Sequence, residues 1–285
     1  MSVTNVNTGD SFATIQDAIN VALSGHVLQI GAGTYVENLT IDKPLVLQGA
    51  GSLSTTIEAT SGDVVTLEAG INGLVRFDGI SLSGGGLADE GIDVKPGANV
   101  DLEFFAGIIT GMAGRGIFAS DSSPANTALT SLSVALASFN NNGTGPANTA
   151  HIKLFGHTGA TTIIDSFFTG GPQIDKAIEI TGALASSGSA NPGPATPPAL
   201  GTTTIENVTV TGDYETDVFA LFNFSDLSDL SFTGPGLDMS GATSAAGRWI
   251  NVDSVTAGTV DLSSVAVPTG TPLPVTALQG EDPAS

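Results

Sequence analysis

Apolar residues recur along this chain in short triplets, in which one residue separates two apolar ones. Seven such triplets begin at Val65, Ile92, Ile117, Ile152, Ile178, Phe219 and Ile250. This alternation predicts a strand with one buried face, and we expect the middle residue of each triplet to face solvent. A strand that buries one face at every repeat is typical of a solenoid, whose core is closed only by stacking successive coils.

A second repeated segment indicates a tight corner between two strands. The segments 77–82, 205–210, 227–232 and 262–267 each place two corner residues before an alternating strand. The second corner residue is Gly79, Asn207 or Asp229 in three of them, and these residue types tolerate the left-handed backbone of a sharp bend. Each coil is therefore predicted to run through strand, loop, strand, corner and strand.

The spacing of the triplets excludes alternating helices and strands. The shortest interval is 25 residues, from Ile92 to Ile117, and longer intervals add loop residues. Short strands at this spacing leave no room for the helices of βαβ units. We therefore expect an all-β chain of parallel coils, in which every strand edge except those at the two ends is paired.

An amphipathic helix is predicted near the N-terminus. Apolar residues recur there at spacings of three and four, with Asp10 and Ser11 as candidate N-caps and Gly25 as a stop. A helix within residues 10–25 would cover the first coil and block edge pairing.

The whole chain, 1–285, is interpreted as one elongated domain. The coils occupy 26–267, a flexible insertion rich in Pro and small residues occupies 183–201, and a Pro-rich tail occupies 268–285. Proline cannot donate ladder hydrogen bonds, so this tail would blunt the last strand edge without a helical lid. The alternative is an end that stacks on another copy or on a further domain.

The N-terminal segment resembles the opening of right-handed parallel β-helix proteins of the pectin-lyase-like superfamily. The residues that carry the resemblance are 11–19 (SFATIQDAI), 29–35 (QIGAGTY), 36–41 (VENLTI) and 44–51 (PLVLQGAG). The resemblance implies a helix-capped β-helix with three sheets, which the coil pattern extends to about residue 267. It does not imply an enzyme, because pectinesterases, lyases, surface proteins and phage proteins share this opening.

The catalytic motifs of the enzymatic members are not present in the sequence. Polygalacturonase-like enzymes place several carboxylates around the glycosidic bond, and this chain has no Asp-Asp pair. The segments around His151 and His157 resemble two other motifs of that group only weakly. Arg248 lacks the paired Asp and Gln partners that pectinesterase-like chemistry needs. We therefore assign no catalytic residue.

Basic residues fall at repeated positions of the coils, within reach of acidic residues on neighbouring coils. The residues two places before the triplets are Asp63, Glu90, Arg115, Ala150, Lys176, Asp217 and Arg248. Because stacked coils lie about 4.8 Å apart, these positions predict a ladder of ion pairs. The expected pairs are Glu90–Arg115, Lys176–Asp217, Asp217–Arg248 and Lys153–Glu179. A surface pair contributes about 0 to 1 kcal/mol, and the ladder explains the basic residues without catalysis.

One group of carboxylates is a candidate calcium site. Asp213, Glu215 and Asp217 occupy alternate positions, and in an extended chain they would point to one side and offer the oxygen ligands that Ca²⁺ prefers. The other interpretation is an acidic loop whose last member pairs with Lys176 or Arg248. No cofactor is required by the sequence, and calcium is the one that has candidate ligands.

Composition limits the partners of the protein. The chain has 28 acidic and 7 basic residues, a formal charge of −21, and no Cys. Such a charge repels nucleic acids, anionic membranes and polyuronates, and no apolar stretch approaches the roughly 18 to 20 residues of a membrane span. We expect neither nucleic-acid binding nor membrane insertion. The remaining partners are a second copy of the chain, other surface proteins and glycans.

Two functions are compatible with these patterns. The first is a non-catalytic structural or adhesive module that is extracellular or on the cell surface and assembles into a layer or filament. The second is a polysaccharide lyase, with an Arg or Lys base, or a carbohydrate-binding β-helix with a divergent site. The start of the chain has no signal-peptide pattern, so export would involve a removed signal, a larger parent chain or another route.

Overall fold

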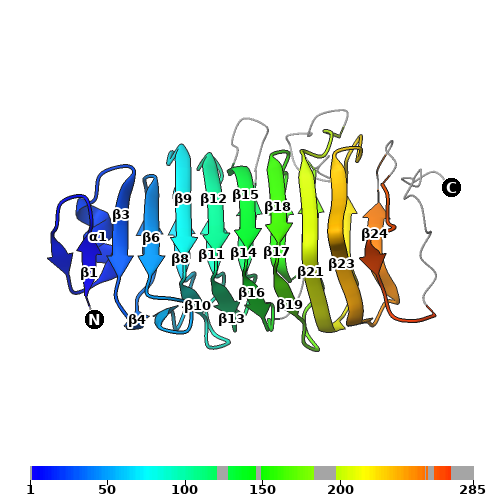
Figure 1. Cartoon of the computed structure of the whole chain (residues 1–285), viewed down its shortest axis with the longest axis horizontal. Coiled ribbons are helices and arrows are strands. Elements are labelled where there is room, and N and C mark those ends of the chain that lie inside the picture. The colour runs from blue at the N-terminus through cyan, green and yellow to red at the C-terminus, as the bar shows by residue number, and fades with distance from the viewer. Residues whose placement is uncertain are drawn as a thin grey trace, which may run out of the picture.

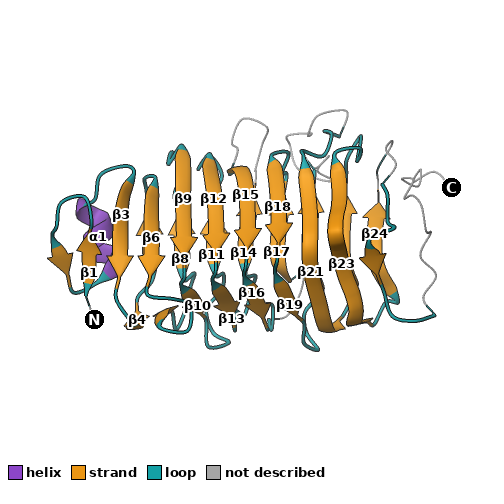
Figure 2. Ribbon diagram, viewed as in Figure 1, coloured by secondary structure: helices purple, strands orange, loops and turns teal. Residues whose placement is uncertain are grey.

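The computed structural model describes residues 2–120, 128–145, 149–182, 197–253, 255 and 260–270. The chain forms a right-handed parallel β-helix of about seven turns with one short helix, so the predicted fold is confirmed. Strands of successive coils lie side by side along a single long axis (Figure 1). Almost all regular structure is strand (Figure 2).

One sheet of the β-helix consists of eight parallel strands, one from each coil. We call it the triplet sheet because it contains all seven predicted triplets. Its strands are β5 (Leu39–Ile41), β8 (Val65–Leu67), β11 (Ile92–Val94), β14 (Ile117–Ser120), β17 (Ala150–Phe155), β20 (Lys176–Thr181), β22 (Asp217–Phe222) and β24 (Arg248–Asp253). The triplets pair in register, as at Ile92 opposite Val65 and Ile117.

The remaining strands form two columns along the other sides of the coil. The first column contains β3 (His26–Ile30), β6 (Leu45–Gly49), β9 (Gly73–Asp78), β12 (Val100–Phe105), β15 (Leu129–Ala135) and β18 (Ala160–Ile164). The second contains β4 (Gly33–Val36), β7 (Thr55–Glu58), β10 (Ser81–Ser83), β13 (Ile108–Thr110), β16 (Ser138–Asn140), β19 (Phe167–Thr169) and β25 (Val265–Ala266). In the last coils β21 (Thr203–Tyr214) and β23 (Leu230–Ser244) run through both columns.

A tight corner with a left-handed residue separates the two columns. Gly79 and Asn207 have φ of 63° and 49°, as predicted. Asp229 does not have a positive φ; in its coil Gly234 takes the corner position, with φ of 59°. The prediction for Asp229 was wrong because the residues that follow it, 230–233 at the start of β23, belong to the first column and not to the second.

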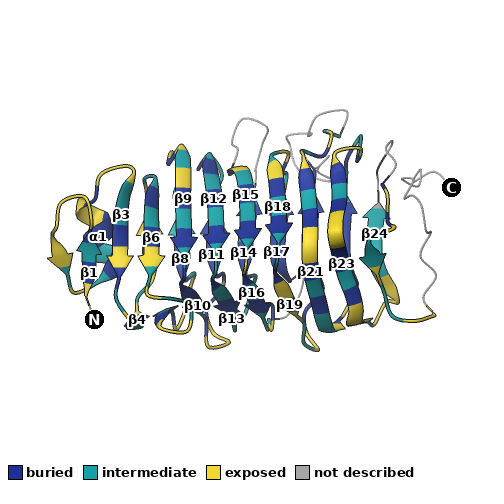
Figure 3. Ribbon diagram, in the orientation of Figure 1, coloured by how far each residue is buried: buried dark blue, intermediate teal, exposed yellow. Residues whose placement is uncertain are grey.

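The core of the β-helix contains a row of aromatic rings that links successive coils. Phe77, Phe104, Phe139 and Phe168 follow one another with centroid separations of 6.4, 6.0 and 4.8 Å, and the last two rings are stacked. All four side chains are fully buried. Buried and partly exposed residues alternate along the strands of the first column (Figure 3), which is the pattern of strands that bury one face.

The N-terminal end is covered by a helix and by an extra strand. Helix α1 (Ile15–Val21) is shorter than the predicted segment, and its N-cap is Thr14 rather than Asp10 or Ser11. Ser11 and Phe12 instead form β2, which pairs antiparallel with β1 (Val3–Asn5). Strand β1 also pairs antiparallel with β3, so it covers the edge of the first coil. Antiparallel coverage at this end was not predicted.

A carboxylate of the first coil holds the start of α1. The Glu37 side chain accepts hydrogen bonds from the backbone amides of Ile15 and Gln16, both at 3.0 Å. Thr14 Oγ1 accepts a third from Asp17 N. These bonds satisfy amides that lack partners inside the helix.

Several predicted segments lie wholly or partly outside the described residues. They are 183–196 of the insertion and 271–285 of the tail. Among the described residues, no helix is long and apolar enough to cross a membrane.

Candidate functional site

Charged side chains gather on the outward side of the triplet sheet and on the turns that flank its strands. Five of the seven basic residues of the chain lie there, namely Lys95, Arg115, Lys153, Lys176 and Arg248. Six acidic residues accompany them, namely Asp63, Glu90, Asp93, Asp175, Glu179 and Asp217. We call these eleven residues the charged ribbon. Its formal charge is close to neutral, so most of the net charge of −21 lies on the rest of the molecule.

The N-terminal part of the ribbon is held by two cations. Arg115 Nη1 lies 2.7 Å from Glu90 Oε1, which confirms the predicted pair, and the guanidinium lies 4.1 Å from the centroid of the Phe118 ring. Lys95 pairs with Asp93 and lies 3.6 Å from Asp63. Burial raises the pKa of Glu90, although Arg115 opposes this effect.

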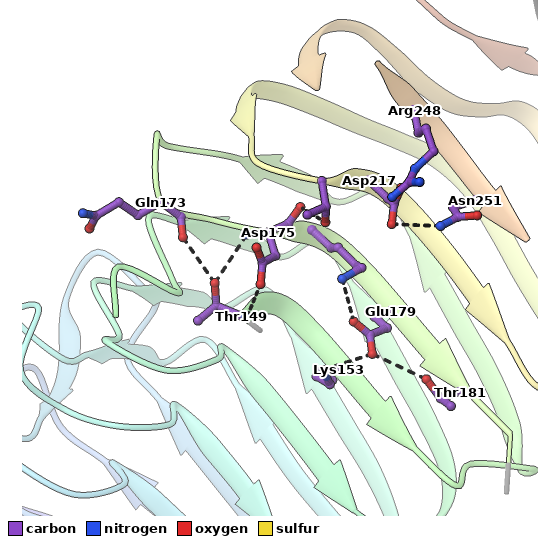
Figure 4. A network of polar contacts seen from close by, with 11 residues as sticks. Thr149, Lys153, Gln173, Asp175, Glu179, Thr181, Asp217, Arg248 and Asn251 are labelled. Carbon is purple, nitrogen blue, oxygen red and sulfur yellow. Dashed lines mark hydrogen bonds and ion pairs between the residues drawn. The ribbon is translucent and has the colours of Figure 1, made fainter. Parts of the chain in front are cut away.

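The centre of the ribbon is a buried group of one acid and two bases (Figure 4). Glu179 Oε1 lies 3.0 Å from Lys153 Nζ, the predicted neighbour, and Glu179 Oε2 lies 3.1 Å from Lys176 Nζ. Lys153 is 3% exposed and Glu179 is 5% exposed. Burial lowers the pKa of Lys153, and the carboxylate of Glu179 opposes this shift. Glu179 thus holds two lysine side chains in contact inside the protein.

The C-terminal part of the ribbon is organised around Asp217. Arg248 Nε lies 2.6 Å from its Oδ1, and Asn251 Nδ2 donates to its Oδ2 at 3.1 Å. The predicted Asp217–Arg248 pair is thus confirmed. The predicted Lys176–Asp217 pair is not found, because Lys176 binds Glu179 on its own strand and both oxygens of Asp217 are occupied.

The three candidate calcium ligands do not share one face. Asp213 and Glu215 are exposed, whereas Asp217 is buried beneath Arg248. Asp213 accepts a hydrogen bond from Thr243 on the neighbouring strand. Within the described part of the chain, no three or more His, Asp or Glu side chains are arranged to hold a metal ion.

Asp175 joins three coils and was not identified from the sequence. Its carboxylate accepts from Thr149 N at 2.9 Å, and Thr149 Oγ1 donates to the carbonyl of Gln173. The backbone carbonyl of Asp175 accepts hydrogen bonds from the amide and the hydroxyl of Thr216. Asp175 lies outside the repeated positions, so the periodicity provides no signal for it.

The middle residues of several triplets are buried, contrary to the prediction that they face solvent. Asp93, Lys153, Glu179 and Ala220 are at most 8% exposed. Strands β17, β20 and β22 are buried on both faces. The predicted surface ladder is therefore largely buried. The prediction failed because alternation along a strand separates its two faces but does not show whether the polar face is covered by other parts of the chain.

The two histidines of the weak motif matches belong to the interior. His151 and His157 are 0% and 2% exposed, and burial lowers their pKa values to about 3 and about 4. The His151 ring lies 5.8 Å from that of Phe168 and 6.1 Å from that of Tyr214. Neither histidine can therefore meet a polymeric substrate.

Asn142 also lies in the interior and is 0% exposed. Its amide donates to the Ile109 carbonyl at 2.9 Å and accepts from Met112 N, and it lies 3.3 Å from His151 Nδ1. Trp249 packs partly buried against the core.

The ribbon has the features of a structural cross-link between coils. Hydrolysis of a glycosidic bond needs two accessible carboxyl groups on either side of the bond, whereas Glu90, Glu179 and Asp217 are buried and each binds a basic side chain. A lyase needs a base that reaches its substrate, and Lys153 is almost completely buried. The charges of the ribbon are instead used in pairs that connect neighbouring coils, such as Glu90–Arg115 and Asp217–Arg248.

Known proteins share partial similarity with this chain. No family model matches the chain. A stretch of 69 residues, 24% of this chain, is 34% identical to a cell surface glycoprotein of Methanothermus fervidus and spans 12% of that protein's length. Similar solved structures include ORF18 of Geobacillus virus E2, with a TM-score of 0.44 and 14% identity over 86% of this chain and 56% of that one. Carrot pectin methylesterase has a TM-score of 0.35 and 13% identity over 96% and 86%.

Proposed function

We propose that the chain is a non-catalytic structural or adhesive module of a cell surface that assembles with copies of itself. The observation that carries this proposal is the charged ribbon, in which Glu90, Glu179 and Asp217 each bind a base of the same or an adjacent coil while almost buried. These groups are engaged in holding the coils together. A rod stiffened in this way suits a structural part.

A surface location is supported by one sequence relative. The stretch similar to a Methanothermus fervidus cell surface glycoprotein is short, but its identity is 34% over 69 residues. A β-helix also suits a surface because its coils add length along one axis, each held by its neighbours. We propose that this chain, like that relative, works at the cell surface.

Calcium would promote assembly by acting between molecules. Because the ribbon is nearly neutral, most of the charge of −21 lies on the remaining surface and makes copies repel one another. Divalent cations bound by exposed carboxylates, such as Asp213 and Glu215, would reduce this repulsion and bridge neighbours.

Electron microscopy and light scattering of the purified full chain test the assembly. We expect ordered oligomers, sheets or filaments in calcium and smaller species in EDTA. Sodium chloride at matched ionic strength is the control for simple charge screening. Dispersed monomers under all three conditions, at every protein concentration tested, would refute self-assembly.

The alternative is a lyase or a carbohydrate-binding protein, and the lowered pKa of Lys153 is the observation that favours a lyase base. Acidic polysaccharides incubated with the protein would then develop the absorbance of unsaturated uronates. We expect no such signal. A signal that disappears in Lys153→Met, with the melting curve retained, would overturn the non-catalytic assignment.

A further inference from the structure

A second face of the β-helix combines uncharged polar side chains with an exposed aromatic ring. It is the outward side of β13, β16, β19 and residues 209–211 of β21, which we call the hydroxyl face. Its eight side chains form two columns along the axis. The first column is Ile108, Ser138, Phe167 and Thr209, and the second is Thr110, Asn140, Thr169 and Thr211.

The hydroxyl face is uncharged within a strongly acidic chain. None of its eight residues is ionisable, whereas the total formal charge is −21. The uncharged stretch continues through Ser83 on β10 and ends at Glu58 on β7 and at Asp238 on β23. A neutral ligand could therefore bind here without removing water from a charged group, which would be costly.

The polar groups of the face are available for hydrogen bonds. The hydroxyls of Thr110 and Thr209 have no partner within the described part of the chain, and Thr169 contacts Thr211 only at 3.5 Å. Asn140 binds Ser138 within the same strand. Hydroxyl and amide groups both donate and accept, as the hydroxyl groups of a sugar do.

An exposed aromatic ring lies in the middle of these polar groups. Phe167 is 57% exposed, although large apolar side chains are usually buried. It is flanked along its column by Ser138 and Thr209. A phenyl ring beside hydroxyl groups can cover the C–H face of a pyranose while its neighbours bind the ring's hydroxyl groups.

We propose that the hydroxyl face binds an extended, neutral polysaccharide that lies along the axis of the β-helix. Successive coils repeat the same pair of positions every 4.8 Å or so, and a polymer of identical sugars repeats its hydroxyl groups in the same way. A regular ligand can thus contact all four strands at once. The absence of basic side chains on the face favours neutral over acidic polymers.

The size of the face argues against a second copy of the chain as its occupant. Four strands about 4.8 Å apart and two outward positions on each cover a patch of roughly 15 by 7 Å between backbone positions. A stable protein interface needs about 800 Å² from each partner. A single sugar chain needs far less width, and fits such a strip.

This proposal rests on the proposed function in one respect, because the hydroxyl face would be the adhesive contact of the proposed surface module. Purified protein would be mixed with insoluble cellulose or chitin, and the depletion from solution measured. We expect saturable binding by the wild type. Phe167→Ala and Thr169→Glu should each weaken it about tenfold, because a lost ring contact and an added charge both act directly on the face.

The matched control is Thr162→Glu, which adds the same charge to a partly exposed threonine of β18 in the first column. It should bind like the wild type. No binding to cellulose, chitin or a soluble neutral glucan, with normal melting curves, would overturn the proposal without affecting the assembly test in calcium. Equal loss in Thr162→Glu would also overturn it, as would a dimer in sedimentation that Thr169→Glu dissociates.

Discussion

Glu179 lies between two lysine side chains in a buried part of the molecule, and its replacement is predicted to lower the stability of the fold. Glu179→Gln would leave Lys153 and Lys176 buried without their carboxylate. Removing one partner of a buried ion pair typically costs about 3 to 5 kcal/mol. Urea denaturation should show a loss of this size in the free energy of unfolding.

Glu103 provides the matched control for this substitution. It pairs with Arg76 at 3.2 Å, but its side chain is 39% exposed. Glu103→Gln should cost at most about 1 kcal/mol, because water screens the pair and replaces it when it is lost. Equal losses for the two variants would show that the ribbon is hydrated and would contradict its structural role.

His151 makes the stability of the protein depend on pH. Its pKa is about 3 in the folded chain, because burial opposes the charged form, and 6.5 is the ordinary value. The unfolded chain therefore binds a proton below about pH 6.5 while the folded chain does not. The contribution of neutral His151 to the free energy of unfolding is fully present above this pH. It is lost as the pH falls toward 3, at up to about 1.4 kcal/mol per pH unit.

The variant His151→Phe removes this titration and keeps a ring among Phe139 and Phe168. The free energy of unfolding, measured between pH 7 and pH 4, should fall less steeply in the variant than in the wild type. Phe139→Leu, which disturbs the same core without a titrating group, should keep the wild-type slope. If the free energy of unfolding fell equally steeply with pH in all three proteins, His151 would not be the source of the pH dependence.

At the scale of the elements, the corners between the two strand columns contain residues that do not suit their backbone. Ala106 and Leu136 occupy the position of Gly79 and Asn207, with φ of 49° and 53°. A side chain with a Cβ atom and no local hydrogen bond costs roughly 1 to 2 kcal/mol in this conformation. The sequence pattern identified the corners with Gly and Asn but could not identify those with Ala or Leu.

Leu136 is the corner where a substitution is expected to stabilise the protein. The side chain is 54% exposed, so little packing is lost on its removal. Leu136→Asn should add about 0.5 to 1 kcal/mol to the free energy of unfolding, since Asn tolerates the left-handed region. Thermal and urea melts would measure the gain.

Leu87 is the control for that substitution, because it is 68% exposed and has no positive φ. Leu87→Asn should leave the stability unchanged. A gain of the same size at both sites would mean that removal of exposed apolar surface, and not backbone strain, is responsible.

For the whole molecule, the excess negative charge predicts that salt stabilises the fold. Most of the charge of −21 lies outside the ribbon, so its self-repulsion opposes the compact state. Raising NaCl from 0.01 M to 1 M shortens the Debye length from about 30 Å to about 3 Å. The melting temperature should therefore rise by several degrees. A constant or falling value over this range would show that the ion pairs of the ribbon outweigh the surface repulsion.

The repeat period, and with it the parallel β-helix, could be derived from the sequence alone. An alternating strand must bury its apolar residues, and at this spacing only stacked coils do so. The same register predicted three ion pairs of the ribbon, among them Glu90–Arg115 and Asp217–Arg248. Pairing between coils follows from position because each residue lies opposite its counterpart one coil away.

The tertiary structure alone decided which polar positions are exposed. Lys153 and Glu179 have the same pattern as a solvent-facing strand, yet they are buried, while Phe167 is apolar and exposed. Exposure depends on what lies over a strand, which involves residues far apart in the sequence. For the same reason Asp175 and the N-terminal strand β1 were not predicted, whereas the column of Lys153 follows from the period. Periodicity places a residue on one face of a strand, and only the folded chain determines what covers that face.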